Sequence, residues 1–106
     1  MNITRDDKKL LEKAVNFVLS DQYRGSSPAR ENLTKKFAAA GLEKIKNSSP
    51  LISFNELVAL SDALRAYSEM LDKSPLCTDT KAIESAHQLS DKFYKAALAL
   101  DSLRHK

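Results

Sequence analysis

Three proline-containing breaks divide this 106-residue chain into four segments, each long enough for one helix. The breaks contain Pro28, Pro50 and Pro75, and a serine stands immediately before each proline. Proline lacks the N–H that an interior helical residue donates, and it disfavours helical backbone in the residue before it. With no tryptophan and few Phe and Tyr residues, most of the core must come from Leu, Ile, Val and Ala, which suits helices. The sequence therefore predicts an all-α protein.

The first two segments carry the start signals of helices. Thr4 is followed by Asp6 and Asp7, an arrangement typical of a hydroxyl cap with acidic residues near the positive end of the helix dipole. We expect this helix over 4–22. Ser27 with Pro28 predicts a second helix over 28–46, because proline is tolerated at the first helical position. Its expected apolar stripe consists of Leu33, Phe37, Ala38, Gly41 and Ile45.

Gly41 lies inside the second predicted helix. A glycine there costs about 1 kcal/mol of helix stability relative to alanine, so its presence needs a reason. Either the helix kinks or ends at this residue, or a neighbouring backbone comes close to it. Of the two, we favour close packing.

The third segment has the strongest local signal in the chain. Ser53 and Glu56 form the S-x-x-E pattern of a capping box, while Ile52 and Leu57 occupy the two positions of a hydrophobic staple. Both patterns place a helix start at the same point. The spacing of the leucines that follow predicts a helix over 54–73.

The last segment predicts a helix over 79–104, capped by Thr78 or Asp79. Its apolar residues recur at alternating intervals of four and three: Ala82, Ala86, Leu89, Phe93, Ala96, Leu100 and Leu103. Additional apolar residues widen this stripe, as expected for a helix that contacts two neighbours in a bundle. Because the connections are short, we predict one domain over 1–106, an antiparallel up-down-up-down four-helix bundle.

The charge distribution points to contacts between helices more than to an external anion. Seventeen Lys and Arg residues and fourteen Asp and Glu residues give a net charge of +3. Residues 28–50 carry five positive and two negative charges, and residues 51–76 carry two and four. The basic second helix is therefore expected to face an acidic third helix.

The expected location is the cytoplasm. Cys77 is the only cysteine, so the chain forms no internal disulfide. The first seven residues are polar and charged, and nowhere does a run of about 18 apolar residues predict a membrane span.

No group of residues predicts catalysis or a cofactor. Glu84 and His87 have a spacing found in metal-binding bundles, but a second such pair is missing and both residues fall on the predicted outer face. Cys77 has no assignable base, and two glycines are too few for a phosphate-binding loop. We therefore expect a protein that is not an enzyme and binds neither metal nor cofactor.

Two sets of residues are candidates for partner contact. The basic residues of the second helix could meet an anionic partner such as nucleic acid: Arg30, Lys35, Lys36, Lys44 and Lys46. Apolar residues at the edges of the predicted stripes could form a protein-contact patch: Val15, Leu19, Phe54, Val58 and Tyr94. The alternative for the second set is that each helix packs against two neighbours and needs a wide stripe.

By elimination, the sequence favours a small helical interaction or regulatory module. We expect its partner to be a protein, either a second copy of this chain in a homodimer or a different chain. The alternative is a nucleic-acid-binding accessory protein that uses the basic second helix.

Overall fold

The computed structural model of the chain describes residues 3–20, 23, 27–47, 52–73 and 80–104. In this part of the chain there are four α-helices and no strand: α1 (Arg5–Leu19), α2 (Pro28–Lys46), α3 (Phe54–Lys73) and α4 (Thr80–Arg104). The helices pack against one another, so the prediction of an all-α four-helix bundle is confirmed. None of these helices has the combination of length and apolar character that crossing a membrane requires.

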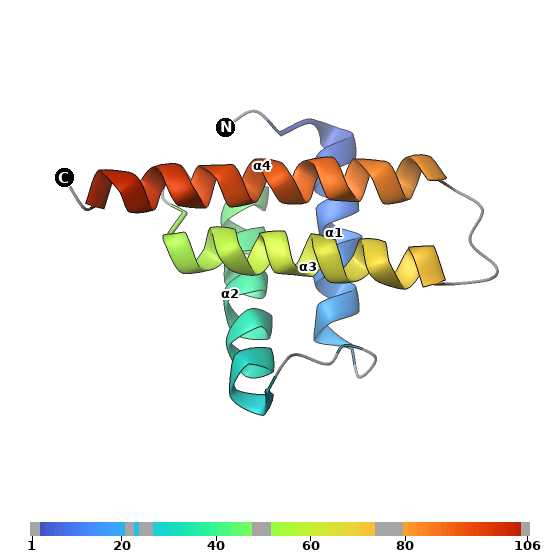
Figure 1. Cartoon of the computed structure of the whole chain (residues 1–106), viewed down its shortest axis with the longest axis horizontal. Helices are drawn as coiled ribbons and strands as arrows, with labels where there is room; N and C mark the ends of the chain where they lie inside the picture. The colour runs from blue at the N-terminus through green and yellow to red at the C-terminus, as the bar shows by residue number, and fades with distance from the viewer. Residues whose placement is uncertain (1–2, 21–22, 24–26, 48–51, 74–79, 105–106) are drawn as a thin grey trace.

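The four helices form two antiparallel pairs. In Figure 1, α1 and α2 run vertically in opposite directions, and α3 and α4 run horizontally in opposite directions. α3 contacts all three other helices, whereas α4 packs mainly on α3 and touches α1 over a small area. The predicted up-down alternation therefore holds within each pair, while α3 runs across α2 instead of alongside it.

Side-chain caps begin the first two helices at the residues that the sequence indicates. The Asp7 N–H donates to Thr4 Oγ1 at 3.1 Å, and the Thr4 N–H donates to the Asp7 carboxylate at 3.2 Å, which completes a capping box. Ser27 Oγ accepts a hydrogen bond from the Arg30 N–H at 3.2 Å, and Pro28 occupies the first turn of α2. These bonds satisfy backbone N–H groups that have no partner within the helix.

α1 ends earlier than the expected range of 4–22. Ser20 has extended backbone with φ −80° and ψ 168°, and its hydroxyl donates to the Phe17 carbonyl at 2.6 Å. Serine hydroxyls compete with the helix for backbone carbonyls in this way. At the start of the last helix, the expected caps Thr78 and Asp79 lie outside the described residues, as does Cys77.

The core is built from all four helices. Its largest fully buried apolar side chains are Leu11, Val15, Val18, Leu60, Leu64 and Phe93. Two residues that the sequence places in apolar stripes lie at the surface instead: Leu33 is 53% exposed and Leu103 is 65% exposed. In α2, the stripe is rotated so that Thr34 and Leu42 are buried.

Gly41 brings α2 and α3 together. A Cβ atom at this position would lie 2.9 Å from Leu60 Cδ1, 3.1 Å from Leu60 Cγ and 3.4 Å from Glu56 Cβ. α2 continues past the glycine to Lys46. The interpretation of close packing is therefore confirmed, but the nearest atoms belong to the side chains of Leu60 and Glu56 and not, as expected, to a neighbouring backbone. α3 crosses α2 at this glycine.

Candidate functional site

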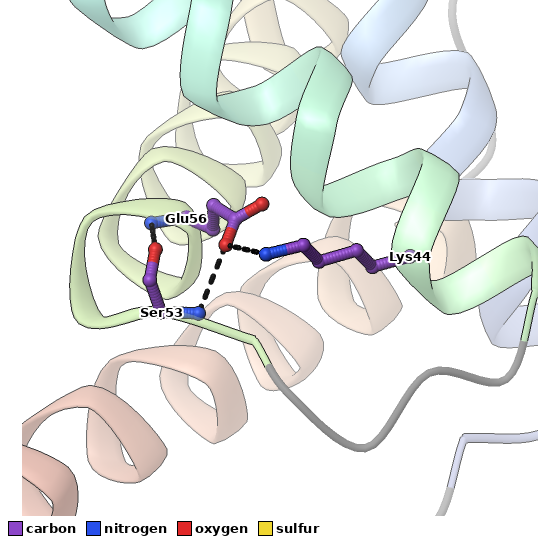
Figure 2. Close-up of polar contacts among 3 residues, drawn as sticks. All are labelled: Lys44, Ser53 and Glu56. Atoms are coloured by element: carbon purple, nitrogen blue, oxygen red, sulfur yellow. Dashed lines mark hydrogen bonds and ion pairs between the residues drawn. The ribbon is translucent and has the colours of Figure 1, made fainter.

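A buried carboxylate joins α2 to the start of α3. Glu56 is 3% exposed, and Figure 2 shows its carboxylate between Ser53 and Lys44. Lys44 Nζ donates to Glu56 Oε1 at 2.7 Å, and the Ser53 N–H donates to the same oxygen at 2.9 Å. The Glu56 N–H in turn donates to Ser53 Oγ at 3.2 Å. The predicted capping box is thus present and also holds a lysine from α2.

The hydrogen bonds to this carboxylate outweigh the cost of burying it. Burial alone would raise the pKa of Glu56, but the bonds from Lys44 and Ser53 favour the charged form and leave the pKa below its ordinary value. Glu56 is therefore ionised at neutral pH and serves as a structural ion-pair partner. Its role in holding α2 is not visible in the local sequence pattern, which identifies only the cap.

Two more basic residues of α2 face its neighbours. Lys46 Nζ lies 3.4 Å from Glu12 Oε1 of α1, in an exposed ion pair. Arg30 influences the pKa of Asp62 on α3. Burial raises the pKa of Asp62, and the positive charges of Arg30 and Arg65 lower it by a smaller amount. The expected facing of a basic second helix and an acidic third is visible in the Lys44–Glu56 pair and in the effect of Arg30 on Asp62, whereas Lys46 pairs with α1.

The five basic residues do not share one face of α2. At about 100° per residue, Lys35 and Lys46 lie about 20° apart on one side, while Lys44 lies about 180° from Lys35. Lys36 Nζ lies 5.7 Å from the centre of the Phe37 ring. The basic side chains therefore point in several directions, and Lys44 and Lys46 have acidic partners within the fold. Contact of these residues with an anionic partner stays a prediction.

A pair of buried serines fixes the register of the α3–α4 hairpin. Ser61 Oγ donates to the Ser90 carbonyl at 3.0 Å, and Ser90 Oγ donates to the Ser61 carbonyl at 2.8 Å. Because the helices are antiparallel, a residue before Ser61 lies level with one equally far after Ser90. Small side chains permit this close approach, and each hydroxyl is satisfied by a backbone oxygen. Sequence analysis did not identify this contact.

This register brings four apolar residues together on one flank of the hairpin. Val58 and Phe54 lie three and seven residues before Ser61, and Tyr94 and Leu98 lie four and eight residues after Ser90. These intervals keep each residue within about 80° of its serine around the helix. In both helices the residues lie on the same flank of the α3–α4 interface. We call Phe54, Val58, Tyr94 and Leu98 the hairpin patch.

The hairpin patch contains three of the five apolar residues that the sequence proposes for partner contact. Tyr94 is 45% exposed, and Phe54 and Val58 are partly buried against the core. Leu98, 49% exposed, was missed, although its position four residues after Tyr94 places both side chains on one side of α4.

The other two proposed residues do not belong to this surface. Val15 is fully buried, so the prediction that it lies in a surface patch is wrong. The physical reason is that α1 contacts both α2 and α3 and needs a wide apolar stripe. Leu19 is 47% exposed at the end of α1, on the other helix pair.

The end of α4 projects beyond α3. Phe54, the first residue of α3, is level with Ala97, so residues 98–104 extend past it by about 10 Å at 1.5 Å per residue. Figure 1 shows this projecting end of α4. It explains why Leu103, which continues the apolar spacing of α4, is exposed: α3 ends its contact before that point.

The described residues include no group of three or more His, Cys, Asp and Glu side chains placed to hold a metal ion. Glu84 and His87, the E-x-x-H pair of the sequence, are both exposed on α4. His105, the other histidine, lies outside the described residues.

Comparisons with protein-family models, with curated proteins and with solved structures find no match to this chain.

Proposed function

We propose that this chain is a non-enzymatic helical module that acts in the cytoplasm by binding another protein through the hairpin patch. The observation that carries the proposal is the exposure of Tyr94 and Leu98 beside Phe54 and Val58, on a flank that two helices build together. Contiguous exposed apolar surface is typical of protein-binding sites.

The chemistry of the patch supports a protein partner. Burying an exposed leucine or an aromatic side chain contributes about 1.5–3 kcal/mol, and tyrosine is among the residues that most often dominate binding energy. The patch also rests on a fixed base, because the Ser61 and Ser90 hydrogen bonds hold α3 and α4 in one register. A surface that is already ordered loses little entropy when a partner binds.

Affinity capture from the native cell tests this proposal. The tagged wild-type chain is compared with a Tyr94→Ser, Leu98→Ser double variant, and captured proteins are quantified by mass spectrometry. The expected result is a partner that the wild type captures and the double variant loses. Both substituted side chains are about half exposed, so the helical circular dichroism signal and the melting temperature should stay close to those of the wild type.

Leu33→Ser is the matched control. Leu33 is as exposed as the patch leucine but lies on α2, so this variant should capture the same partner as the wild type. Equal capture by the wild type and the double variant would show that the hairpin patch is not the binding surface. Loss of the partner in both variants would point to general surface hydrophobicity instead.

A further inference from the structure

We infer that Lys44, on α2, positions the end of the hairpin patch that Phe54 forms on α3. This inference rests on the proposed function and concerns how its binding surface is held in place. The first turn of α3 presents Phe54, and an ion pair bonds the same turn to α2.

The first turn of α3 has little apolar burial of its own. Ser53 and Asn55 are exposed, and Phe54 is partly buried against the core. Glu56, the buried residue of this turn, is 3% exposed and carries a carboxylate. A segment with few buried apolar contacts opens more readily than the core of a fold. The polar bonds of the turn therefore determine how firmly it stays closed.

Lys44 supplies the bond that anchors this turn to another helix. Its Nζ donates to Glu56 Oε1 at 2.7 Å, and Figure 2 shows the side chain reaching this carboxylate from α2. The N–H groups of Glu56 and Leu57 bond back to Ser53, at 3.2 Å to its Oγ and at 3.0 Å to its carbonyl. An opening of the turn would move Glu56 away from Lys44. Because hydrogen bonds between charged groups are the stronger ones, the ion pair opposes this opening.

The geometry of the turn links this anchor to the patch. Phe54 lies two residues before Glu56, which places it about 160° round the helix at about 100° per residue. Fixing the Glu56 side of the turn against α2 therefore fixes the orientation of Phe54 on the opposite side, one turn before Val58. Without the anchor, a partner would have to order the turn as it binds, and its apparent affinity would fall.

The start of α1 offers an internal comparison. The Asp7 N–H donates to the Thr4 hydroxyl at 3.1 Å, and the Lys8 N–H donates to the Thr4 carbonyl at 3.0 Å, as in the capping box of α3. The Asp7 carboxylate accepts from the Thr4 N–H within the same turn. Among the described residues, the box of α3 is the one that includes a lysine from another helix.

Hydrogen exchange of single amides, measured by NMR and corrected for intrinsic rates, tests the inference. The turn amides, those of Glu56 and Leu57, are expected to exchange at least about tenfold more slowly than the Asp7 and Lys8 amides, because the anchored turn opens less often. Lys44→Met should accelerate the turn amides by about tenfold and leave Asp7 and Lys8 unchanged.

A second variant separates local opening from unfolding of the whole chain. Val18→Ala removes two methyl groups from a fully buried side chain of α1, so it lowers overall stability without removing a bond of the turn. It should accelerate the Leu64 amide in the middle of α3 and leave the turn amides unchanged. Ser53→Ala, at an exposed residue, should accelerate the turn amides and keeps the test valid even if Lys44→Met perturbs folding.

Capture from the native cell tests the link to the patch. At a temperature where circular dichroism shows both variants to be folded, Lys44→Met should capture at least about twofold less partner than Val18→Ala. Val18→Ala should capture as much as the wild type.

Three results would overturn the inference: turn amides that exchange as fast as those of Asp7 and Lys8, equal acceleration of the turn amides by Val18→Ala and Lys44→Met, or equal capture by these two variants. In each case the proposed function still stands if capture depends on Tyr94 and Leu98.

Discussion

The α2–α3 crossing and the α3–α4 hairpin both bring two helices close together, but by different chemistry. At the crossing, Gly41 has no side chain to separate the helices, and the Lys44–Glu56 ion pair joins them beside it. In the hairpin, both helices keep short side chains, and two serine hydroxyls bond to backbone oxygens across the interface. α3 takes part in both contacts.

The difference shows what each kind of polar group needs when it is buried. The Glu56 carboxylate requires a cation and a backbone N–H to stay charged in the core, so it ties α3 to a particular residue of α2. The serines need only each other's backbone, which every residue has. The crossing therefore depends on specific side chains, whereas the hairpin depends mainly on small size.

The largest expected effect is that of filling the crossing. Gly41→Val should lower the free energy of unfolding by about 2–3 kcal/mol, because its Cβ would lie 2.9 Å from Leu60 Cδ1 in a side chain that is fully buried. Chemical denaturation measures this. Ala40→Val, at the exposed neighbour, is the control and should cost about 0.6 kcal/mol through helix propensity alone. If the two variants were equally mild, α2 and α3 would not be held at this distance.

Removing the cation at the crossing should come next. Lys44→Met is expected to cost about 2 kcal/mol at pH 7, because it leaves a buried carboxylate with only the Ser53 bonds. Lys46→Met removes an exposed pair and should cost no more than about 0.5 kcal/mol. Equal costs for the two lysines would contradict the distinction between the buried and the exposed pair.

The same variant has a defined pH dependence. In the wild type, the pKa of Glu56 is below its ordinary value of 4.5, so the ion pair stabilises the fold above that pH and is lost as the pH falls through the lower folded-state value. The stability difference between wild type and Lys44→Met should therefore shrink as the carboxylate is protonated. Without Lys44, burial should raise the pKa of Glu56 above that of the wild type, as carboxyl NMR titration would show.

A smaller effect is expected in the hairpin. Ser61→Ala and Ser90→Ala should each cost about 1 kcal/mol, because each removes one hydroxyl hydrogen bond to a backbone carbonyl. The two hydroxyl oxygens also lie 3.0 Å apart, so the cost of the double variant should differ from the sum of the two single costs. Ser68→Ala is the control: this buried hydroxyl bonds to the Arg65 carbonyl within its own helix, so its loss should cost less. Additive costs for Ser61 and Ser90 would show that their contact carries no coupling.

The smallest expected effect has the opposite sign. Burial raises the pKa of Asp62, while Arg30 and Arg65 oppose this shift only in part. The charged form of Asp62 therefore lowers the free energy of unfolding above the raised pKa, and this loss disappears as the pH falls below that pKa. Asp62→Asn should stabilise the fold at pH 7 by a few tenths of a kcal/mol, since the residue is partly exposed. If Asp62→Asn instead destabilised the fold relative to the exposed control Asp72→Asn, the attraction of Asp62 to the two arginines would outweigh the cost of its burial.

Local chemistry made the helix boundaries predictable. The expected ranges 28–46 and 54–73 coincide with α2 and α3. Both helices begin with a capping hydrogen bond between residues three apart in the chain, and the Ser27 and Ser53 hydroxyls accept these bonds. The end of α1 was less predictable, since Ser20 bonds back to Phe17 and ends the helix early. Apolar spacing identified most of the core but placed Leu33 inside, because spacing alone does not fix how a helix is rotated.

The candidate site was predictable only as separate residues. Sequence spacing identified Phe54, Val58 and Tyr94 as apolar residues at stripe edges, but it included Val15, which α2 and α3 cover, and omitted Leu98. Assembling the hairpin patch requires the register of α3 against α4, which Ser61 and Ser90 set across 29 residues of chain.

By itself, then, the sequence determined four helices and the caps of the first three, since those hydrogen bonds and spacings are local. Tertiary structure decided that α3 crosses α2 at Gly41, that Lys44 reaches Glu56, and that one flank of α3 and α4 carries an exposed apolar patch. The reason is physical: which side chains meet depends on the direction and rotation of whole helices, and these follow from packing among residues far apart in the chain.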